Sequence, residues 1–324
     1  MWALLRMTVL HAEYQAELDS RLPDFKGSLL RGALGHSLKE LSCARPEEVA
    51  GEICAACLRP DRCAGGALFD PIGPGPERDA AHDRPVPFVL ATPDDHRVAF
   101  RAGDRLGVSL TLIGSGRVWL PWIIAALADL GWKGLGAERQ PWGLSGLWSE
   151  GPVGVRTPIE PGSLGVGVSV PELSARELVA ALPIPKSGAA VLRFLSPAHL
   201  QREKRLVESI DGPLLMSRLL RRLGGLLEYY ERWDPSGFDF RSLIDLAARA
   251  RCLDSRLERR SLERYSSRQG TKHEMTGLVG RLTLAEVPPE IWPYLVLGQW
   301  THIGKSASFG MGRYRLEPIE NLQA

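Results

Sequence analysis

The chain has 324 residues, of which 44% are hydrophobic and 24% charged, a composition typical of a globular protein with room for about two domains. No apolar run reaches 18 residues, and the N-terminal segment lacks the apolar stretch and cleavage site of a signal peptide. These features argue against a membrane-spanning or secreted protein, and we expect a cytoplasmic one.

The first module is predicted to follow the order strand, helix, two strands, helix and a final strand within the region that follows. The predicted strands are 5–14, 97–100 and 105–113, and the predicted helices are 26–41 and 119–130. The first helix carries Leu30, Leu34, Leu38 and Leu41 on one face. We assign residues 1–150 to this N-terminal domain and place a cysteine-containing insertion at 43–71.

Residues 133–188 are rich in glycine and proline, which weaken regular elements. We therefore expect a linker or the edge of a sheet at 151–188. The second module, 189–324, is predicted to contain a strand at 190–195, a helix at 213–233 and a basic amphipathic stretch over 240–264 that could continue as a helix. A hairpin at 276–284, a helix at 291–300 and a strand at 313–317 follow. A βαββαβ order that occurs twice predicts an α+β fold of two tandem ferredoxin-like (RRM-like) domains.

A glycine-rich turn lies between the last predicted helix and the last strand. Gly304, Gly310 and Gly312 permit positive φ, and free N–H groups beside Lys305 and Arg313 would suit phosphate binding. Gly304-Lys305-Ser306 imitates a nucleotide P-loop. The spacing excludes that motif, because Gln299 stands where its first glycine is required, and a P-loop joins a strand to a following helix.

Charge is distributed unevenly along the chain. The formal net charge is only +2, yet residues 249–281 carry nine lysines or arginines against four acids. A local field of this kind favours a polyanion such as a nucleic acid as the partner.

Several segments together resemble a known family. The glycine turn is similar to the glycine-rich loop of the RAMP superfamily, and the whole chain resembles a CRISPR-associated endoribonuclease that processes precursor guide RNA. The segment Phe25 to Gly35 resembles the start of that family's first helix. Arg264 to Gly270, leading into Gly277 to Gly280, resembles its basic turn and hairpin.

This resemblance implies a metal-independent cleavage of repeat RNA by its own 2'-hydroxyl, which gives a 2',3'-cyclic phosphate and a 5'-hydroxyl. Such a reaction requires a base, an acid and cations, and no cofactor. The family's histidine, where present, often lies on or beside the first helix, where His36 stands here. The helical wheel places His36 on the polar side, away from the leucines. Lys39 and Tyr14 are candidate stabilisers, and His302 and His273 are alternate histidines.

The remaining cations and polar groups are candidates for RNA contact. Arg260, Arg264 and Arg268 recur every four residues and would form one stripe on a continuing helix. The other RNA-binding candidates are Lys26, Arg31, Gln269, Lys272, Lys305, Ser306, Ser308 and Arg313. Repeat RNA or guide RNA is the expected partner, with other CRISPR effector subunits as further partners. The alternative function is a RAMP subunit that binds guide RNA without cutting it.

Four cysteines fall within 21 residues. Cys43, Cys54, Cys57 and Cys63 could supply four thiolates to a structural zinc ion, because disulfides are disfavoured in the cytosol. Only the Cys54–Cys57 spacing is typical of such a site. Zinc is thus a structural hypothesis with no role in the chemistry.

Overall fold

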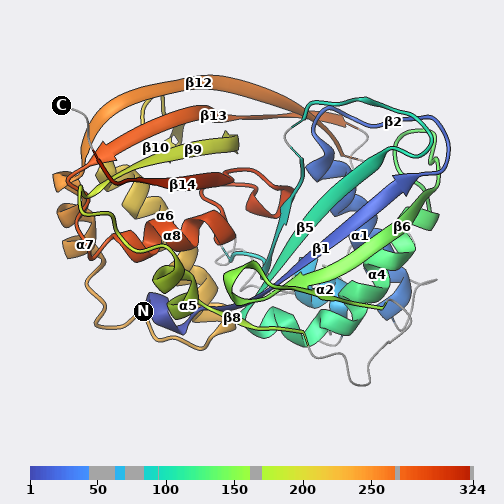
Figure 1. Cartoon of the computed structure of the whole chain (residues 1–324), viewed down its shortest axis with the longest axis horizontal. Coiled ribbons are helices and arrows are strands. Elements are labelled where there is room, and N and C mark those ends of the chain that lie inside the picture. Colours follow the sequence, from blue (N-terminus) through green and yellow to red (C-terminus); the bar gives the residue numbers. More distant parts are fainter. Residues whose placement is uncertain (44–62, 70–83, 94, 161–169, 267–270, 322–324) are drawn as a thin grey trace. The chain divides into compact units, whose positions relative to one another are not determined.

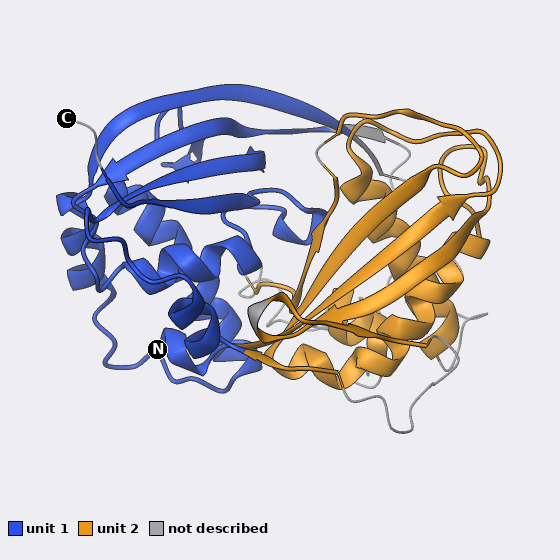
Figure 2. Cartoon of the chain, viewed as in Figure 1, with its two compact units in different colours: residues 1–5, 174–324 blue, residues 6–173 orange. Residues whose placement is uncertain are grey.

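A computed structural model describes residues 1–43, 63–69, 84–93, 95–160, 170–266 and 271–321. The chain forms two compact units (Figure 2). We call residues 6–173 the N-terminal unit. Residues 1–5 and 174–324 make up the C-terminal unit.

The N-terminal unit is an antiparallel sheet covered on one face by helices (Figure 1). Its strands are β1 (Arg6–Ala16), β3 (Phe88–Ala91), β5 (Arg105–Ile113), β6 (Trp142–Glu150) and β7 (Arg156–Pro158), arranged in the order β3-β5-β1-β6-β7. Its helices are α1 (Lys26–Ser42), α2 (Ala64–Phe69) and α4 (Leu120–Trp132), with η4 (Gly114–Trp119) before α4 and η5 (Pro152–Gly154) after β6. Two short strands, β2 (Ser20–Arg21) and β4 (Ala99–Phe100), pair separately.

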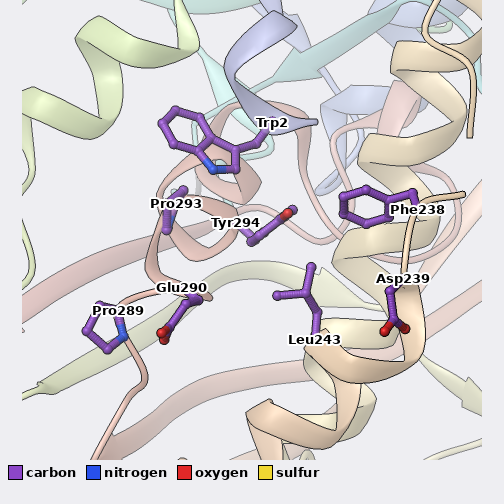
Figure 3. A pocket seen from close by; sticks show the side chains of 8 residues that line it. All are labelled: Trp2, Phe238, Asp239, Leu243, Pro289, Glu290, Pro293 and Tyr294. Atoms are coloured by element: carbon purple, nitrogen blue, oxygen red, sulfur yellow. The ribbon is translucent and has the colours of Figure 1, made fainter.

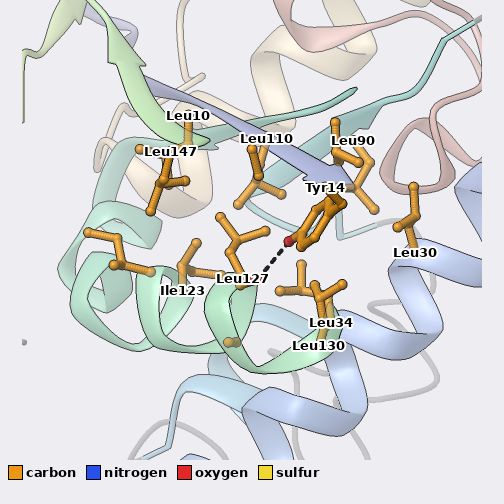
Figure 4. Packing of buried hydrophobic residues seen from close by; sticks show 14 of the residues in the cluster. Leu10, Tyr14, Leu30, Leu34, Leu90, Leu110, Ile123, Leu127, Leu130 and Leu147 are labelled. Carbon is orange, nitrogen blue, oxygen red and sulfur yellow. Dashed lines mark hydrogen bonds between the residues drawn. The ribbon is translucent and has the colours of Figure 1, made fainter. Parts of the chain in front are cut away.

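The core of this unit lies between the sheet and its helices (Figure 4). Leu10 and Tyr14 alternate along β1 toward the helices, and Leu30 and Leu34 of α1 are buried against them. The Tyr14 hydroxyl donates a hydrogen bond of 2.6 Å to the carbonyl of Leu127 on α4. Leu41, which was predicted on the same helix face, is exposed near the end of α1.

The C-terminal unit repeats the architecture. Its sheet has the order β12-β13-β9-β14, formed by β9 (Ala189–Ala198), β12 (Arg251–Ser266), β13 (Thr271–Ala285) and β14 (Tyr314–Ile319). The helices are α5 (Ala175–Ala181), α6 (Gly212–Tyr230), α7 (Phe240–Leu246) and α8 (Trp292–Thr301). The remaining short elements are η1 (Trp2–Leu4), β8 (Leu173–Ser174), β10 (Gln201–Arg202), β11 (Arg205–Leu206), η6 (Ala247–Arg249) and η7 (Ala307–Phe309).

Local sequence signals explain where the helices of this unit begin. The Asp211 carboxylate accepts a hydrogen bond from the N–H of Leu214 at 2.8 Å, and Pro213 occupies the first turn of α6. Ser174 and Glu177 form a capping box at the start of α5.

Both units have the ferredoxin-like strand order. In the N-terminal unit β1, α1, β3, β5, α4 and β6 follow one another along the chain, and in the C-terminal unit β9, α6, β12, β13, α8 and β14 do so. In each sheet the first strand lies between the third and the fourth. The predicted fold class of two tandem ferredoxin-like domains is therefore confirmed.

Two predicted elements are wrong. The basic segment 240–264 is not one helix, because α7 and the short η6 are followed by strand β12 from Arg251. Residues 276–284 are not a hairpin but part of β13, which pairs along its length with β12. Within the glycine- and proline-rich stretch, residues 142–150 form β6, which pairs with β1.

Candidate functional site

His36 lies on the exposed side of α1. Its side chain is 63% exposed, whereas Leu30 and Leu34 of the same helix are buried. The Nε2 atom of His36 is 2.7 Å from a carboxylate oxygen of Glu40, one turn further along α1. Because a carboxylate accepts and cannot donate, Nε2 carries the proton in this contact and Nδ1 is the acceptor nitrogen of the neutral ring.

The Glu40 carboxylate is itself held in a network between α1 and α4. Its second oxygen bonds to the ammonium of Lys133, which also pairs with Asp129. The hydrogen bond from Lys133 is the main cause that lowers the pKa of Glu40, so this group stays anionic beside His36. The network fixes the tautomer and orientation of His36, an arrangement typical of histidines that transfer protons.

Two glycines of α1 near His36 have different surroundings. Gly32 faces open space. A side chain at Gly35, however, would lie 2.9 Å from the ring of Phe69. The missing side chain at this position therefore makes room for α2 and not for a substrate. Arg31 stacks its guanidinium on Phe69, 4.8 Å from the ring centroid.

Two predicted site residues of the N-terminal unit are buried. Tyr14 lies in the core with its hydroxyl donated to Leu127, and burial raises its pKa, so it offers no accessible hydroxyl. The ammonium of Lys26 is 3.1 Å from Asp95 and its side chain is fully buried. Neither group is placed to contact RNA, and Lys39 on α1 is half-buried.

His302 is 2% exposed and has a positive φ of 55° at the end of α8. Its Nδ1 atom is 3.1 Å from the carbonyl of Met311. Burial, reinforced by the cations Arg313 and Arg222, lowers the pKa of His302 to about 3. His302 is thus a neutral structural residue under the glycine turn.

The glycine turn uses most of its N–H groups internally. The N–H groups of Lys305 and Gly312 donate to the carbonyls of His199 and Pro197, and that of Arg313 donates to the Ser196 hydroxyl. A side chain at Gly304 would lie 2.6 Å from the His199 carbonyl. The expected open phosphate cradle is therefore wrong for these positions, because the glycines let the turn pack on the end of β9.

Some polar side chains of the turn remain accessible. Lys305 is exposed, Arg313 is half-buried, and Ser308 is buried at 8% exposure. Ser306 adopts a left-handed conformation with a φ of 62°. Lys305 is thus the turn's clearest candidate for a phosphate contact.

The basic segment lies on β12, at the edge of the C-terminal sheet. Four residues along a strand advance about 13 Å, compared with about 6 Å along a helix, so Arg260 and Arg264 are further apart than predicted. Arg256 and Arg281 both pair with Asp254. Arg268 and Gln269 lie outside the described residues, and the side chains of Arg264, Lys272 and His273 are likewise outside the description.

Two of the four clustered cysteines fall within the described ranges. Cys43 follows the end of α1 and Cys63 precedes α2, where the N–H of Gly65 donates to the Ser42 hydroxyl. The N–H of Gly66 lies 3.2 Å from the Cys63 sulfur. Cys54 and Cys57 lie outside the described residues, so the structural zinc site stays a prediction.

Sequence reasoning missed a second exposed histidine pair. His96 has a positive φ of 50°, and its Nδ1 atom is 2.8 Å from a carboxylate oxygen of Asp24. Their separation of 72 residues gives no periodic signal in the sequence. The His36–Glu40 spacing, by contrast, is visible as a helical turn.

A pocket of about 610 Å³ lies in the C-terminal unit between η1, α7 and the start of α8 (Figure 3). Trp2, Phe238 and Tyr294 give it an apolar lining, and its polar side chains are those of Asp239 and Glu290. Two carboxylates repel phosphate, so this pocket does not suit an RNA backbone. None of the predicted site residues lines it.

Comparisons with known proteins place these units in context. Residues 192–314 match the family described as the CRISPR-associated endoribonuclease Cas6, and residues 5–163 match one described as an N-terminal domain, AF_1859_N. An uncharacterized protein of Archaeoglobus fulgidus is 26% identical over 302 residues, which cover 91% of this chain and 92% of that protein. Within the residues described, no helix is long and apolar enough to span a bilayer.

Solved Cas6 structures share the fold. Thermus thermophilus Cas6 has a TM-score of 0.55 at 16% identity, with 96% of this chain and 98% of that chain covered. A Cas6 product complex has a TM-score of 0.54 at 19% identity, covering 96% and 99%. A partial Cas6-RT-Cas1–Cas2 complex reaches 0.61 at 13% identity, but this chain spans only 47% of that one.

At these identities the structures establish the fold alone. The match of residues 192–314 to the Cas6 endoribonuclease family, together with the fold shared with solved Cas6 structures, supports a CRISPR-associated protein of the Cas6 type.

Proposed function

We propose that this protein is a metal-independent endoribonuclease that cuts CRISPR repeat RNA into guide RNA. The observation that carries the proposal is the match to the Cas6 endoribonuclease family over residues 192–314. The oriented, exposed His36 on the first helix supports it, because a proton-transfer group must be reachable by the substrate.

The proposed reaction needs only groups of the RNA and of this chain. The 2'-hydroxyl oxygen attacks the adjacent phosphorus, a bond from phosphorus to O2' forms, and the bond from phosphorus to O5' breaks. His36 accepts the 2'-hydroxyl proton on Nδ1, and the leaving O5' takes up a proton from a water molecule, which gives a 2',3'-cyclic phosphate and a 5'-hydroxyl. Glu40 stabilises the imidazolium that forms.

In this proposal, cations of the C-terminal unit bind the phosphates of the RNA. Lys305 on the glycine turn and Arg260 on β12 are assigned to phosphate contacts, because lysine and arginine that neutralise phosphates release condensed counterions. Repeat RNA is the proposed substrate. Similar structures include a Cas6 product complex and a Cas6-RT-Cas1–Cas2 complex, so other CRISPR proteins are proposed as further partners.

Incubation of the purified protein with its cognate repeat RNA in excess EDTA tests the proposal. Discrete fragments that end in a cyclic phosphate are expected. A mobility shift without cleavage, both with and without EDTA, would instead identify a RAMP subunit that binds guide RNA. Cleavage that requires added divalent metal would overturn the metal-independent mechanism.

A further inference from the structure

A hydrogen-bonded cluster lies on the sheet face of the N-terminal unit that points away from α1 and α4. His11 alternates with the core residues Leu10 and Ala12 along β1, so its side chain lies on the opposite face. The strand register sets Ser109 of β5 directly beside it on one side and Trp148 of β6 on the other.

Both ring nitrogens of His11 are engaged. Nδ1 is 2.8 Å from the Ser109 hydroxyl, and Nε2 is 2.8 Å from a carboxylate oxygen of Glu150. Since the carboxylate only accepts, Nε2 donates to Glu150, and Nδ1 of the neutral ring accepts the Ser109 proton. The edge of the ring is therefore occupied and its orientation is fixed.

Serine, histidine and glutamate in contact also suggest a hydrolase triad, but the backbone excludes one. Acyl transfer needs free N–H groups beside the serine to hold the developing oxyanion. Ser109 lies on β5 between two strands, and the next residue, Leu110, is paired with Leu10 on β1 and with Leu90 on β3. The N–H groups at this place belong to the sheet ladder.

The ring faces of His11 and Trp148 are engaged in stacking contacts. The rings of His11 and Trp148 stack with centroids 5.6 Å apart and planes inclined by 15°. The guanidinium carbon of Arg156, on β7, lies 5.2 Å from the centroid of Trp148. The three side chains form a ladder across three adjacent strands, and Arg156 at its end is exposed.

Two carboxylates of this face already have partners. Arg105 is 2.8 Å from Glu13, and Glu150 bonds to His11. Arg156 takes part in no ion pair within the described part of the chain, where its contact is the indole of Trp148. An exposed guanidinium on an aromatic ring can exchange that ring for a phosphate, because the Arg156 side chain reaches solvent.

We propose that an unpaired base of the RNA stacks on the face of Trp148 that Arg156 now covers, while Arg156 turns to a neighbouring phosphate. This inference rests on the proposed function, since it assigns a second contact to the same RNA. Aromatic side chains on a sheet accept single-stranded bases with little dependence on sequence. The hydrogen bonds that fix His11 also hold Trp148 in place before binding, which reduces the entropy lost on association.

Affinity for single-stranded RNA tests the surface. With a labelled repeat RNA held uncut by a 2'-deoxy substitution at the cleavage position, Trp148→Ala should weaken binding about tenfold to a hundredfold. Trp148→Phe should retain most of the affinity, and Arg156→Gln should weaken binding with a smaller salt dependence. The matched control is Trp122→Ala, because Trp122 is a half-exposed tryptophan on α4, on the helical side of the same unit.

Photocrosslinking keeps the test valid if Trp148→Ala unfolds. RNA with 4-thiouridine at unpaired positions should crosslink wild-type protein within residues 142–158. Wild-type protein that cleaves RNA but crosslinks only elsewhere would overturn this inference and leave the proposed function intact. Protein that neither binds nor cuts the RNA would overturn both.

Discussion

His36 and Glu40 form a pair in which the carboxylate orients the imidazole, and proton transfer is the role proposed for that imidazole. His36→Ala should therefore reduce cleavage at least about a hundredfold while RNA affinity stays within a few-fold, because a proton-transfer group acts on the transition state far more than on binding. Single-turnover cleavage and filter binding of the same variant measure the two effects.

Glu40→Gln and His96→Ala complete the comparison. The amide keeps a hydrogen-bond acceptor for Nε2 but removes the charge that stabilises the imidazolium, so an intermediate loss with a shifted pH profile is expected. His96→Ala is the control for an exposed, carboxylate-paired histidine of the same unit. If cleavage is strongly reduced in His96→Ala and unchanged in His36→Ala, proton transfer would be assigned to His96 instead.

His302 makes stability depend on pH. Its pKa is about 3 when folded and near 6.5 when unfolded, so between these values the unfolded chain binds the proton that the folded chain excludes. The stability from a neutral His302 should be present above about pH 6.5 and fall as the pH drops toward 3. Urea unfolding at several pH values should show a shallower decline for His302→Gln, and equal slopes would contradict this assignment.

At the scale of elements, the edge strand β12 and the glycine turn each present a cation. Arg260→Gln and Lys305→Gln should each weaken binding to all RNA sequences and reduce the slope of log affinity against log salt by about one. Arg241→Gln on α7 is the control, because that side chain is 92% exposed in the same unit. A slope unchanged in both variants but reduced in the control would remove these two residues from the interface.

Substitutions of the glycines in the turn are expected to affect the stability of the fold more than RNA binding. A side chain at Gly312, where φ is 69°, would lie 1.8 Å from the Ile303 carbonyl. Gly312→Ala should therefore lower the free energy of unfolding by about 1 to 3 kcal/mol through strain and backbone displacement. Chemical denaturation measures the change, and a fully stable variant with impaired RNA binding would restore the phosphate-cradle interpretation.

The corner between α1 and α2 is where the zinc hypothesis is tested. Elemental analysis should find about one zinc ion per chain, and Cys54→Ser with Cys57→Ser should lower stability without a selective loss of activity. Cys252→Ser is the matched control, because Cys252 is an exposed thiol of the C-terminal unit. Metal-free protein of full stability would exclude the site.

At the scale of the whole molecule, the sequence predicts the fold because hydrophobic periodicity is strong where elements have one buried face. The helix over 26–41 and the strand over 105–113 are both found nearly as predicted. Strand β12 was misread because leucines at 253 and 257 repeat with a helical spacing while most of its side chains are exposed. Pairing with β13 overrides that local preference.

Site residues were harder to predict than elements. The wheel placed His36 correctly on the exposed side of its helix. The alternation of Leu10, Ala12 and Tyr14 with polar residues is a local signal for the core that the prediction of Tyr14 as a site residue overlooked. The partners of His11, by contrast, lie 98 and 139 residues away. Such contacts come from strand register, which periodicity alone does not give.

The position of β12 at the end of its sheet has a consequence for solubility. One edge of this 16-residue strand is paired with β13, and an edge strand of that length is a template for association with another chain. Arginines outnumber acidic residues on β12, so its net positive charge disfavours pairing with a second copy. Any variant that neutralises several of these arginines should aggregate more readily, so the same side chains would keep the protein in solution as well as serve the proposed RNA contact.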